Sequence, residues 1–256
     1  MKPLFWFWAA TFLLLALPVF AFDLDRLSPE DQKKVDSILE RLDPPMTLKK
    51  QEGSAALLTF PDLYALLPAE DQSFFNQIRS LDPASLGATA HTFPEEGKTE
   101  FVKLERQPVR RRTPSEEIGP QFLPRKVYEA YETMMKAMEK DLGRRLYVES
   151  GYRSPAYQLY QFLFYLPKHD YSIRETNRFV ALPGHSEHGS PHHQAIDFIN
   201  QDGINGEDHP EEFEALPEYA WLTQHAREFG FVLSYPRDNP WHTSFEPWHW
   251  HYEGKD

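Results

Sequence analysis

The chain has 256 residues, a formal net charge of −12 at pH 7 and no cysteine. So acidic a surface argues against nucleic acid or an anionic membrane as the partner, and the lack of cysteine excludes a disulfide framework and lipid attachment through a cysteine. Without the N-terminal segment described next, about 235 residues remain, enough for one large domain or for a domain with an accessory region. We expect a monomer.

Residues 1–21 have the pattern of a secretory signal peptide. Lys2 precedes an uncharged apolar run from Leu4 through Leu17, and Val19-Phe20-Ala21 places small residues where a signal peptidase cleaves. A signal peptide that is cleaved after Ala21 would direct export of the protein to the periplasm or the cell envelope. The apolar run is also close to spanning length, so an uncleaved N-terminal membrane anchor is the alternative.

Residues 22–118 are expected to form a helical and loop-rich accessory region. Ser28-Pro29-Glu30 predicts a helix start, because serine caps a helix and proline is tolerated at its first position. Apolar spacing continues this helix through Leu42, and a second helical pattern begins at Pro68. Arg110-Arg111-Arg112 could bind an anionic polymer, but a solvated loop is the simpler interpretation. Nothing in this region indicates chemistry.

Residues 119–256 indicate an α+β domain, a small and mainly antiparallel sheet flanked by helices. A helical apolar stripe runs from residue 123 to about residue 143, and residues 145–150 have the composition of a strand. Arg153 would then lie in the loop that leaves this strand, with Gln158 on the next helix. An arginine at a strand exit is well placed to bind a carboxylate with both arms of its guanidinium.

Two polar clusters follow in apolar surroundings. The first is Ser186-Glu187-His188 with Ala195-Ile196-Asp197, and the second is Glu246-Pro247-Trp248-His249 on a predicted final strand. A carboxylate inside a half-buried strand needs a cation or several donors to offset its desolvation. Together the clusters offer two imidazoles and one carboxylate, with a glutamate beside them. Such a set of groups is typical of a catalytic zinc centre.

Glu246 and His249 lie three residues apart. In a strand, side chains an odd number of residues apart face opposite sides of the sheet. Both can face one site only if the chain bends between them. Pro247 makes such a bend plausible, because proline lacks a backbone donor and has a fixed φ.

Four motifs in this order resemble those of the VanY-type D-alanyl-D-alanine carboxypeptidases, zinc peptidases of bacterial cell-wall metabolism. The resemblance spans Gly119 to Gly254 and does not include the region before it. The motifs are Ser150-Gly151-Tyr152-Arg153-Ser154 with Gln158, Gly184 to His188 with Ala195 and Asp197, Gly230-Phe231 through Tyr235-Pro236, and Glu246-Pro247-Trp248-His249.

The resemblance implies a role for each matching residue. His188, Asp197 and His249 would bind zinc, one ion per chain. Glu246 would be the catalytic base, and Arg153 would bind the terminal carboxylate of the substrate.

Further substrate contacts are expected from Gln158, Ser186 and Trp248. The implied reaction removes a C-terminal D-alanine from peptidoglycan stem peptides. The alternatives are a zinc-containing module that binds cell-wall peptide without cleaving it, and a peptidoglycan endopeptidase that uses the same site.

The sequence departs from the family pattern in two places. Eight residues separate His188 from Asp197, where the family usually has six, so His192 or His193 could replace His188 as the ligand. The family commonly has arginine two residues after the last histidine, and this chain has His251. With His251 in place of that arginine, it is open which side chain holds the metal-binding residues in position.

Overall fold

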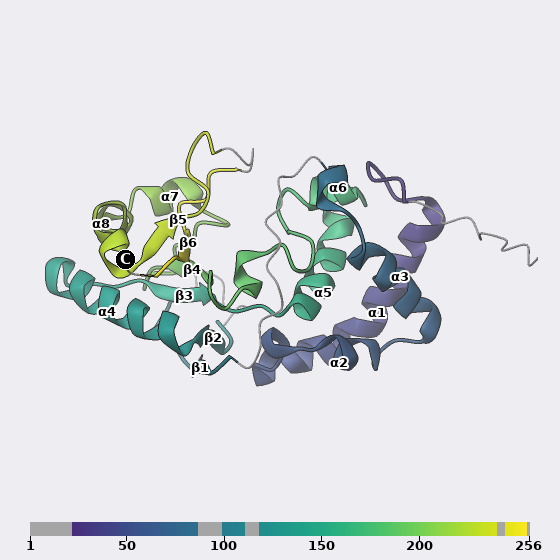
Figure 1. Ribbon diagram of the computed structural model, residues 1–256, viewed down its shortest axis with the longest axis horizontal. Helices are drawn as coiled ribbons and strands as arrows, with labels where there is room; N and C mark the ends of the chain where they lie inside the picture. The colour runs from purple at the N-terminus through teal and green to yellow at the C-terminus, as the bar shows by residue number, and fades with distance from the viewer. Residues whose placement is uncertain (1–21, 87–98, 111–117, 240–243, 255–256) are drawn as a thin grey trace, which may run out of the picture.

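The computed structural model of the chain describes residues 22–86, 99–110, 118–239 and 244–254. They form an elongated molecule with a helical half and a half built on an antiparallel sheet (Figure 1). The predicted signal peptide, residues 1–21, lies outside the described residues, as do Arg111 and Arg112 of the basic loop. Among the described helices, none has both the length and the apolar character that a membrane span requires.

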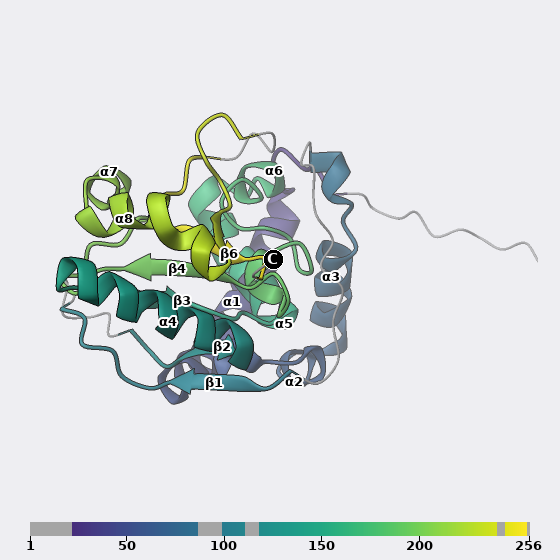
Figure 2. The ribbon, with the colours of Figure 1, turned by 60° about the vertical axis from the view of Figure 1, so that its left-hand side comes forward.

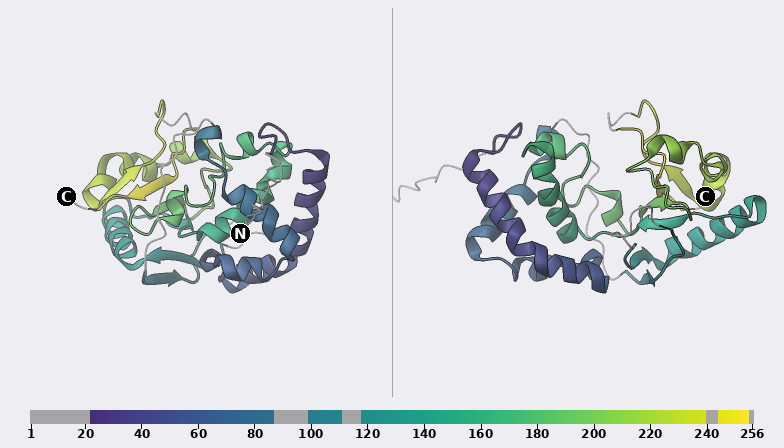
Figure 3. Two further views of the ribbon diagram at one scale, coloured as in Figure 1. Left: turned by 45° about the vertical axis from the view of Figure 1, so that its right-hand side comes forward. Right: turned by 180° about the vertical axis from the view of Figure 1, so that it is seen from behind.

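The helical half consists of α1 (Pro29–Glu52), α2 (Phe60–Tyr64), α3 (Ala69–Arg79), α5 (Pro155–Tyr165) and α6 (Ile173–Thr176). Buried side chains from all five helices make one hydrophobic core. Helices α5 and α6 lie between the N-terminal helices and the sheet, as Figures 1 and 3 show. The N-terminal helices therefore pack directly on helices from the middle of the chain.

Helix α1 is longer than the sequence pattern predicts. It starts as expected after Ser28, whose side chain caps it, but it continues past Leu42 to Glu52 with Pro44-Pro45 in its interior. Prolines inside a helix remove backbone hydrogen bonds. Met46 nevertheless extends the buried apolar stripe of the preceding turns and is fully buried. Packing of this stripe offsets the local cost of the two prolines.

The sheet has the strand order β3-β4-β6-β5, and each neighbouring pair is antiparallel. Its strands are β3 (Tyr147–Ser150), β4 (Ala195–Ile199), β5 (Phe231–Leu233) and β6 (His249–Tyr252). Helices α4 (Arg125–Leu142), α7 (Pro210–Glu214) and α8 (Pro217–His225) lie against it in the same half (Figure 2). The predicted α+β class is confirmed.

The two faces of the sheet have different environments. Ile196, Phe198, Trp250 and Tyr252 belong to the hydrophobic core that includes α4 and α8. Because side chains alternate along a strand, Asp197 and His249 project from the opposite face. That face is turned toward the helical half, so the alternation directs the polar residues to the junction between the halves.

The structure corrects the prediction for the last strand. Strand β6 begins at His249, and Pro247 and Trp248 form a turn before it. Glu246 therefore lies outside the strand. The expected bend at Pro247 is present, and the His249 amide donates to the Glu246 carbonyl at 3.2 Å.

A second, two-stranded sheet was not predicted; one of its strands falls in the region expected to form helices and loops, and the other at the start of the domain that follows. Strand β1 (Phe101–Leu104) pairs with β2 (Gln121–Pro124), which leads directly into α4. Helix α8 is followed directly by a 3₁₀ turn. The 3₁₀ turns are η1 (Ala55–Leu57), η2 (Pro83–Leu86), η3 (Leu166–His169), η4 (Glu187–Gly189) and η5 (Ala226–Phe229).

Candidate active site

A cavity of about 1270 Å³ lies between the two halves. The sheet half contributes Asp197, Glu246 and His249 to its lining, and the helical half contributes Arg153 and the segment around Lys50 to Ala56. The region before residue 118 thus forms part of the wall of the cavity that contains the candidate metal ligands.

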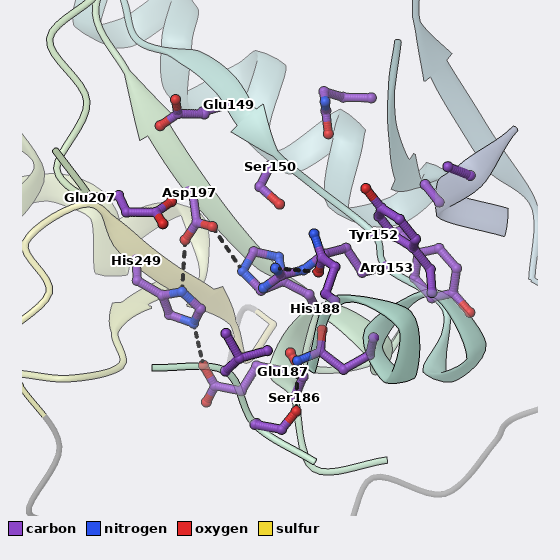
Figure 4. Close-up of a pocket in the computed structure, with 18 of the residues that line it drawn as sticks. Glu149, Ser150, Tyr152, Arg153, Ser186, Glu187, His188, Asp197, Glu207 and His249 are labelled. Atoms are coloured by element: carbon purple, nitrogen blue, oxygen red, sulfur yellow. Dashed lines mark hydrogen bonds and ion pairs between the residues drawn. The ribbon is translucent and has the colours of Figure 1, made fainter. Parts of the chain in front are cut away.

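Three residues that are distant in sequence meet in this cavity. Asp197 of β4 and His249 of β6 are direct partners in the antiparallel ladder. His188 belongs to η4, and its Nε2 lies 3.0 Å from Asp197 Oδ2. His249 Nδ1 lies 2.8 Å from Asp197 Oδ1 (Figure 4). Potential ligand atoms of the three residues all lie within 4.8 Å of one another.

The orientation of His188 fits a metal ligand. Its Nδ1 is 2.8 Å from the Gly151 carbonyl, which can only accept, so Nδ1 bears the proton and Nε2 has a lone pair. Nε2 is buried and makes no hydrogen bond, although it lies next to the Asp197 carboxylate. A lone pair facing a carboxylate is unfavourable unless a cation lies between them. Zinc, which takes nitrogen and carboxylate ligands, suits this donor set.

The outer nitrogen of His249 has its own partner. Nε2 lies 2.9 Å from Glu187 Oε2, so it donates to that carboxylate and Nδ1 is the atom directed toward the candidate metal position (Figure 4). A carboxylate in this arrangement sets the tautomer and the ring orientation of a metal-binding histidine.

Burial and charge shift the pKa values of these groups in opposite directions. Burial lowers the pKa of His188 to about 4, and the Arg153 charge adds to this effect. Burial would also lower the pKa of His249, but Asp197 and Glu187 outweigh it and raise the value to about 10. Burial would raise the pKa of Asp197, yet the two histidines hold it well below its usual range. At neutral pH the metal-free site holds one imidazolium, on His249.

Glu246 lies beside the cluster of His188, Asp197 and His249 but is not one of its members. Its Oε2 is 3.8 Å from His249 Nδ1, and its backbone amide donates to the Tyr235 carbonyl at 3.1 Å. Burial raises the pKa of Glu246 to about 7, with Asp197 and other carboxylates adding to the rise and His249 opposing it. A carboxylate with a pKa near neutrality is suited to exchanging protons with a reacting group.

Arg153 lies in a loop that three different segments hold in place. The backbone amides of residues 152–154 donate in turn to Phe122 O of β2 at 2.7 Å, to His188 O of η4 at 3.0 Å and to Ala56 O of η1 at 2.9 Å. Among the residues that the structure describes, the guanidinium has one hydrogen bond, from Nη1 to Gln161 Oε1 at 3.0 Å, and its buried Nε has no partner. The chain path is therefore fixed, while donors of the guanidinium remain available to a ligand.

Gln158 and Ser186 also line the cavity, and both are buried. The amide nitrogen of Gln158 donates to the Ala181 carbonyl at 2.8 Å, and its buried Oε1 has no partner in the described part of the chain. Only one end of this side chain is free for a ligand.

Trp248 lines the cavity and packs against the core of the sheet half. Gly206 lies flat on its indole, and a Cβ at this glycine would approach the ring to 2.0 Å. The alternative ligands His192 and His193 are exposed and do not belong to the His188, Asp197 and His249 cluster.

Sequence reasoning assigned no role to Glu187, Glu207 or Tyr235, which also line the cavity. Glu187 is adjacent to His188 in the quoted motif, so its position was the available signal. Tyr235 packs against the His249 ring, with the two rings tilted by 41° and their centroids 5.0 Å apart. Glu207 lies near Asp197 in Figure 4, but it comes from a loop whose position no sequence pattern indicates.

A deep cleft with two imidazoles, a carboxylate and an adjacent glutamate defines a site of the metallohydrolase type. The chain belongs to the VanY family, D-alanyl-D-alanine carboxypeptidase, whose model matches residues 120–255. The resemblance inferred from the motifs is thereby confirmed, and with it membership of a family of peptidases.

Individual relatives agree with the family match. The candidate carboxypeptidase YodJ of Bacillus subtilis (strain 168) is 31% identical over 142 residues, which are 55% of this chain and 50% of that protein. The chain thus matches about half the length of this curated relative.

Among solved structures, the LD-carboxypeptidase LdcB is 23% identical with a TM-score of 0.49, covering 68% of this chain and 79% of its own. A zinc complex of a variant of the vancomycin resistance D,D-pentapeptidase VanY is 24% identical with a TM-score of 0.47. It covers 64% of this chain and 84% of its own.

Proposed function

We propose that the protein is a zinc-dependent carboxypeptidase that removes a C-terminal D-alanine from peptidoglycan stem peptides. The observation that supports this most is the His188, Asp197 and His249 cluster, with Glu246 beside it in an open cavity. Family membership supports peptidase chemistry, and the proposal adds the metal, the substrate and the role of each residue.

In this proposal His188, Asp197 and His249 hold one zinc ion. Bound zinc supplies Lewis acidity, which makes a water more acidic and polarises the scissile carbonyl. Glu246 accepts the proton of the attacking water and then delivers it to the nitrogen of the leaving D-alanine. A pKa of about 7 in the absence of metal suits both halves of this proton transfer, since the group can exchange a proton near neutral pH.

Arg153 would bind the terminal carboxylate of the substrate and so make the enzyme an exopeptidase. Its guanidinium has donors available, and its loop is fixed by three segments of the fold. Gln158 Oε1, Ser186 and Trp248 would complete the walls around the terminal residue. A fixed anchor matters, because correct placement of the scissile bond accounts for a large part of catalysis.

A module that binds zinc and peptide without cleavage is less well supported. A structural zinc site closes all four positions with protein ligands, whereas three ligands and a free carboxylate are typical of a catalytic site. As for location, we propose export, with residues 1–21 as the signal peptide and residues 22–118 as an accessory region of the peptidase domain.

The direct test is digestion of defined muropeptides, with the products identified by mass. Loss of one alanine from a stem peptide that ends in D-alanyl-D-alanine is the expected result. Cleavage only of cross-linked dimers would instead indicate an endopeptidase. Binding of zinc without any cleavage of either substrate would support the non-catalytic module.

A further inference from the structure

The carboxylate behind His249 is itself held by a second layer of polar side chains. Glu187 accepts from His249 through Oε2, while its Oε1 lies 3.5 Å from His251 Nδ1. The hydroxyl of Ser234, which follows β5, helps to lower the pKa of Glu187, and its Oγ is 2.8 Å from His251 Nδ1. These side chains form a connected network that ends on a candidate zinc ligand.

The two nitrogens of His251 are both held in place. Its Nδ1 lies 2.8 Å from Ser234 Oγ and 3.5 Å from Glu187 Oε1, and its Nε2 lies 3.3 Å from Glu253 Oε1. The ring is therefore fixed against the outer oxygen of Glu187. The other oxygen of Glu187, Oε2, accepts the Nε2 proton of His249.

Strand geometry brings the network together. His249 and His251 are two residues apart on β6 and so project from the same face of the sheet. The Ser234 amide donates to the His249 carbonyl at 3.2 Å, which fixes Ser234 beside both rings. All of these side chains are largely enclosed: Ser234 is 7% exposed, and the His251 and Glu187 side chains are 14% and 15% exposed.

We propose that His251 and Ser234 are positioning residues of the metal centre, a proposal that rests on the zinc site of the proposed function. They keep the Glu187 carboxylate in the orientation that receives the Nε2 proton of His249. That orientation directs His249 Nδ1 toward the candidate metal position. Outer partners of metal-binding histidines typically contribute about 10- to 100-fold in metal affinity.

Two substitutions at one position separate this role from simple packing. His251→Asn keeps a polar group close to the position of Nδ1, whereas His251→Leu keeps bulk without a polar group. Ser234→Ala removes the bridging hydroxyl from the other side. His225→Leu is the matched control, because His225 also pairs with a glutamate, at 2.9 Å, but does not line the cavity.

The measurement is the zinc affinity of the full chain, by competition with a chromophoric chelator, together with the absorption spectrum of the cobalt(II) form. We expect His251→Leu and Ser234→Ala to weaken zinc binding by about tenfold or more and to change the cobalt spectrum. His251→Asn should stay within about threefold of wild type, and His225→Leu should match wild type.

Wild-type affinity in both His251→Leu and Ser234→Ala would overturn the proposal. Equal losses in His251→Asn and His251→Leu would also overturn it, because the polar contact at Nδ1 would then not be what matters. The unfolding temperature of the metal-free variants identifies any loss that comes from misfolding. If the wild-type chain itself binds no zinc, the proposed function fails, which is a separate result from unaffected variants.

Discussion

Asp197 and His249 face each other across the β4–β6 ladder, and Asp197 Oδ1 lies 2.8 Å from His249 Nδ1. In the metal-free protein this contact is an ion pair, because the pKa of His249 is raised to about 10 and that of Asp197 is held low. A metal that binds Nδ1 must displace the proton that Asp197 and Glu187 stabilise. Metal binding therefore exchanges a proton for a metal ion at His249 Nδ1.

The first prediction is that zinc binding at pH 8 releases about one proton. His249 is still protonated at that pH, whereas His188, with its pKa lowered to about 4, is already neutral. Apparent zinc affinity should accordingly rise by about tenfold per pH unit as the pH increases toward the pKa of His249. Calorimetry in buffers of different ionisation enthalpy measures the proton count. A binding heat that is independent of the buffer would contradict the assigned protonation of His249.

The second prediction concerns catalysis by Glu246. Glu246→Gln keeps the size of the side chain but cannot accept a proton, so kcat should fall by about 10²–10⁴-fold. Zinc content should stay at one ion per chain, because Glu246 is not among the three proposed ligands. Stopped assays on a stem peptide and metal analysis of the same sample check both points. Loss of metal in this variant would place Glu246 among the ligands instead.

The same substitution should stabilise the metal-free protein at neutral pH. The folded pKa of Glu246, about 7, lies above the 4.5 of an unperturbed glutamate. Between pH 4.5 and 7 the unfolded chain releases this proton while the folded chain keeps it, so this group's contribution to stability falls as the pH rises. Above pH 7 the loss is complete and amounts to on the order of 3 kcal/mol. Denaturant unfolding at pH 4 and pH 8 should show Glu246→Gln more stable than wild type only at pH 8.

A fourth prediction tests Arg153. Arg153→Lys keeps the charge but loses the planar pair of donors, so kcat/KM should fall by at least about tenfold. Converting the terminal carboxylate of the substrate to an amide should lower the activity of the wild-type enzyme by a similar factor. The two changes together should cost less than the product of their separate effects, since they remove the same interaction. Equal cleavage of acid and amide substrates would exclude this role for Arg153.

The fifth prediction concerns the longer spacing between His188 and Asp197. His188→Ala should abolish stoichiometric zinc, because it removes the buried Nε2 that faces Asp197. Alanine at both His192 and His193 should leave zinc binding unchanged, since both side chains are exposed and outside the cluster. Metal analysis after gel filtration distinguishes the variants. The opposite pattern would mean that the extra residues shift the ligand.

Local sequence patterns predicted much of the candidate site. The run Ala195-Ile196-Asp197 predicted a strand with one carboxylate among apolar residues, and β4 has that form. The three-residue spacing of Glu246 and His249 required a bend at Pro247, and the turn is there, although the strand begins only after it. These features depend on alternation along a strand and on the fixed φ of proline, which operate over a few residues and can be inferred without the rest of the chain.

Other features depend on contacts between distant segments, and tertiary structure alone decided them. Helix α1 continues through Pro44-Pro45 because its buried face packs on α3 and α5, which local propensity cannot anticipate. The wall that the N-terminal region adds to the cavity, and the Ala56 carbonyl that holds Ser154, depend on the same packing.

The sequence by itself determined which groups are available: two imidazoles, a carboxylate, a neighbouring glutamate and an arginine at a strand exit. The fold decided which nitrogen of each imidazole faces the metal position, because Gly151 and Glu187 accept the other proton of each ring. It also made Glu187 an outer partner and left His192 and His193 at the surface. Tautomers, pKa shifts and outer partners arise from distances of about 3 Å between residues far apart in the chain, and those distances exist only once the sheet and the helices have packed.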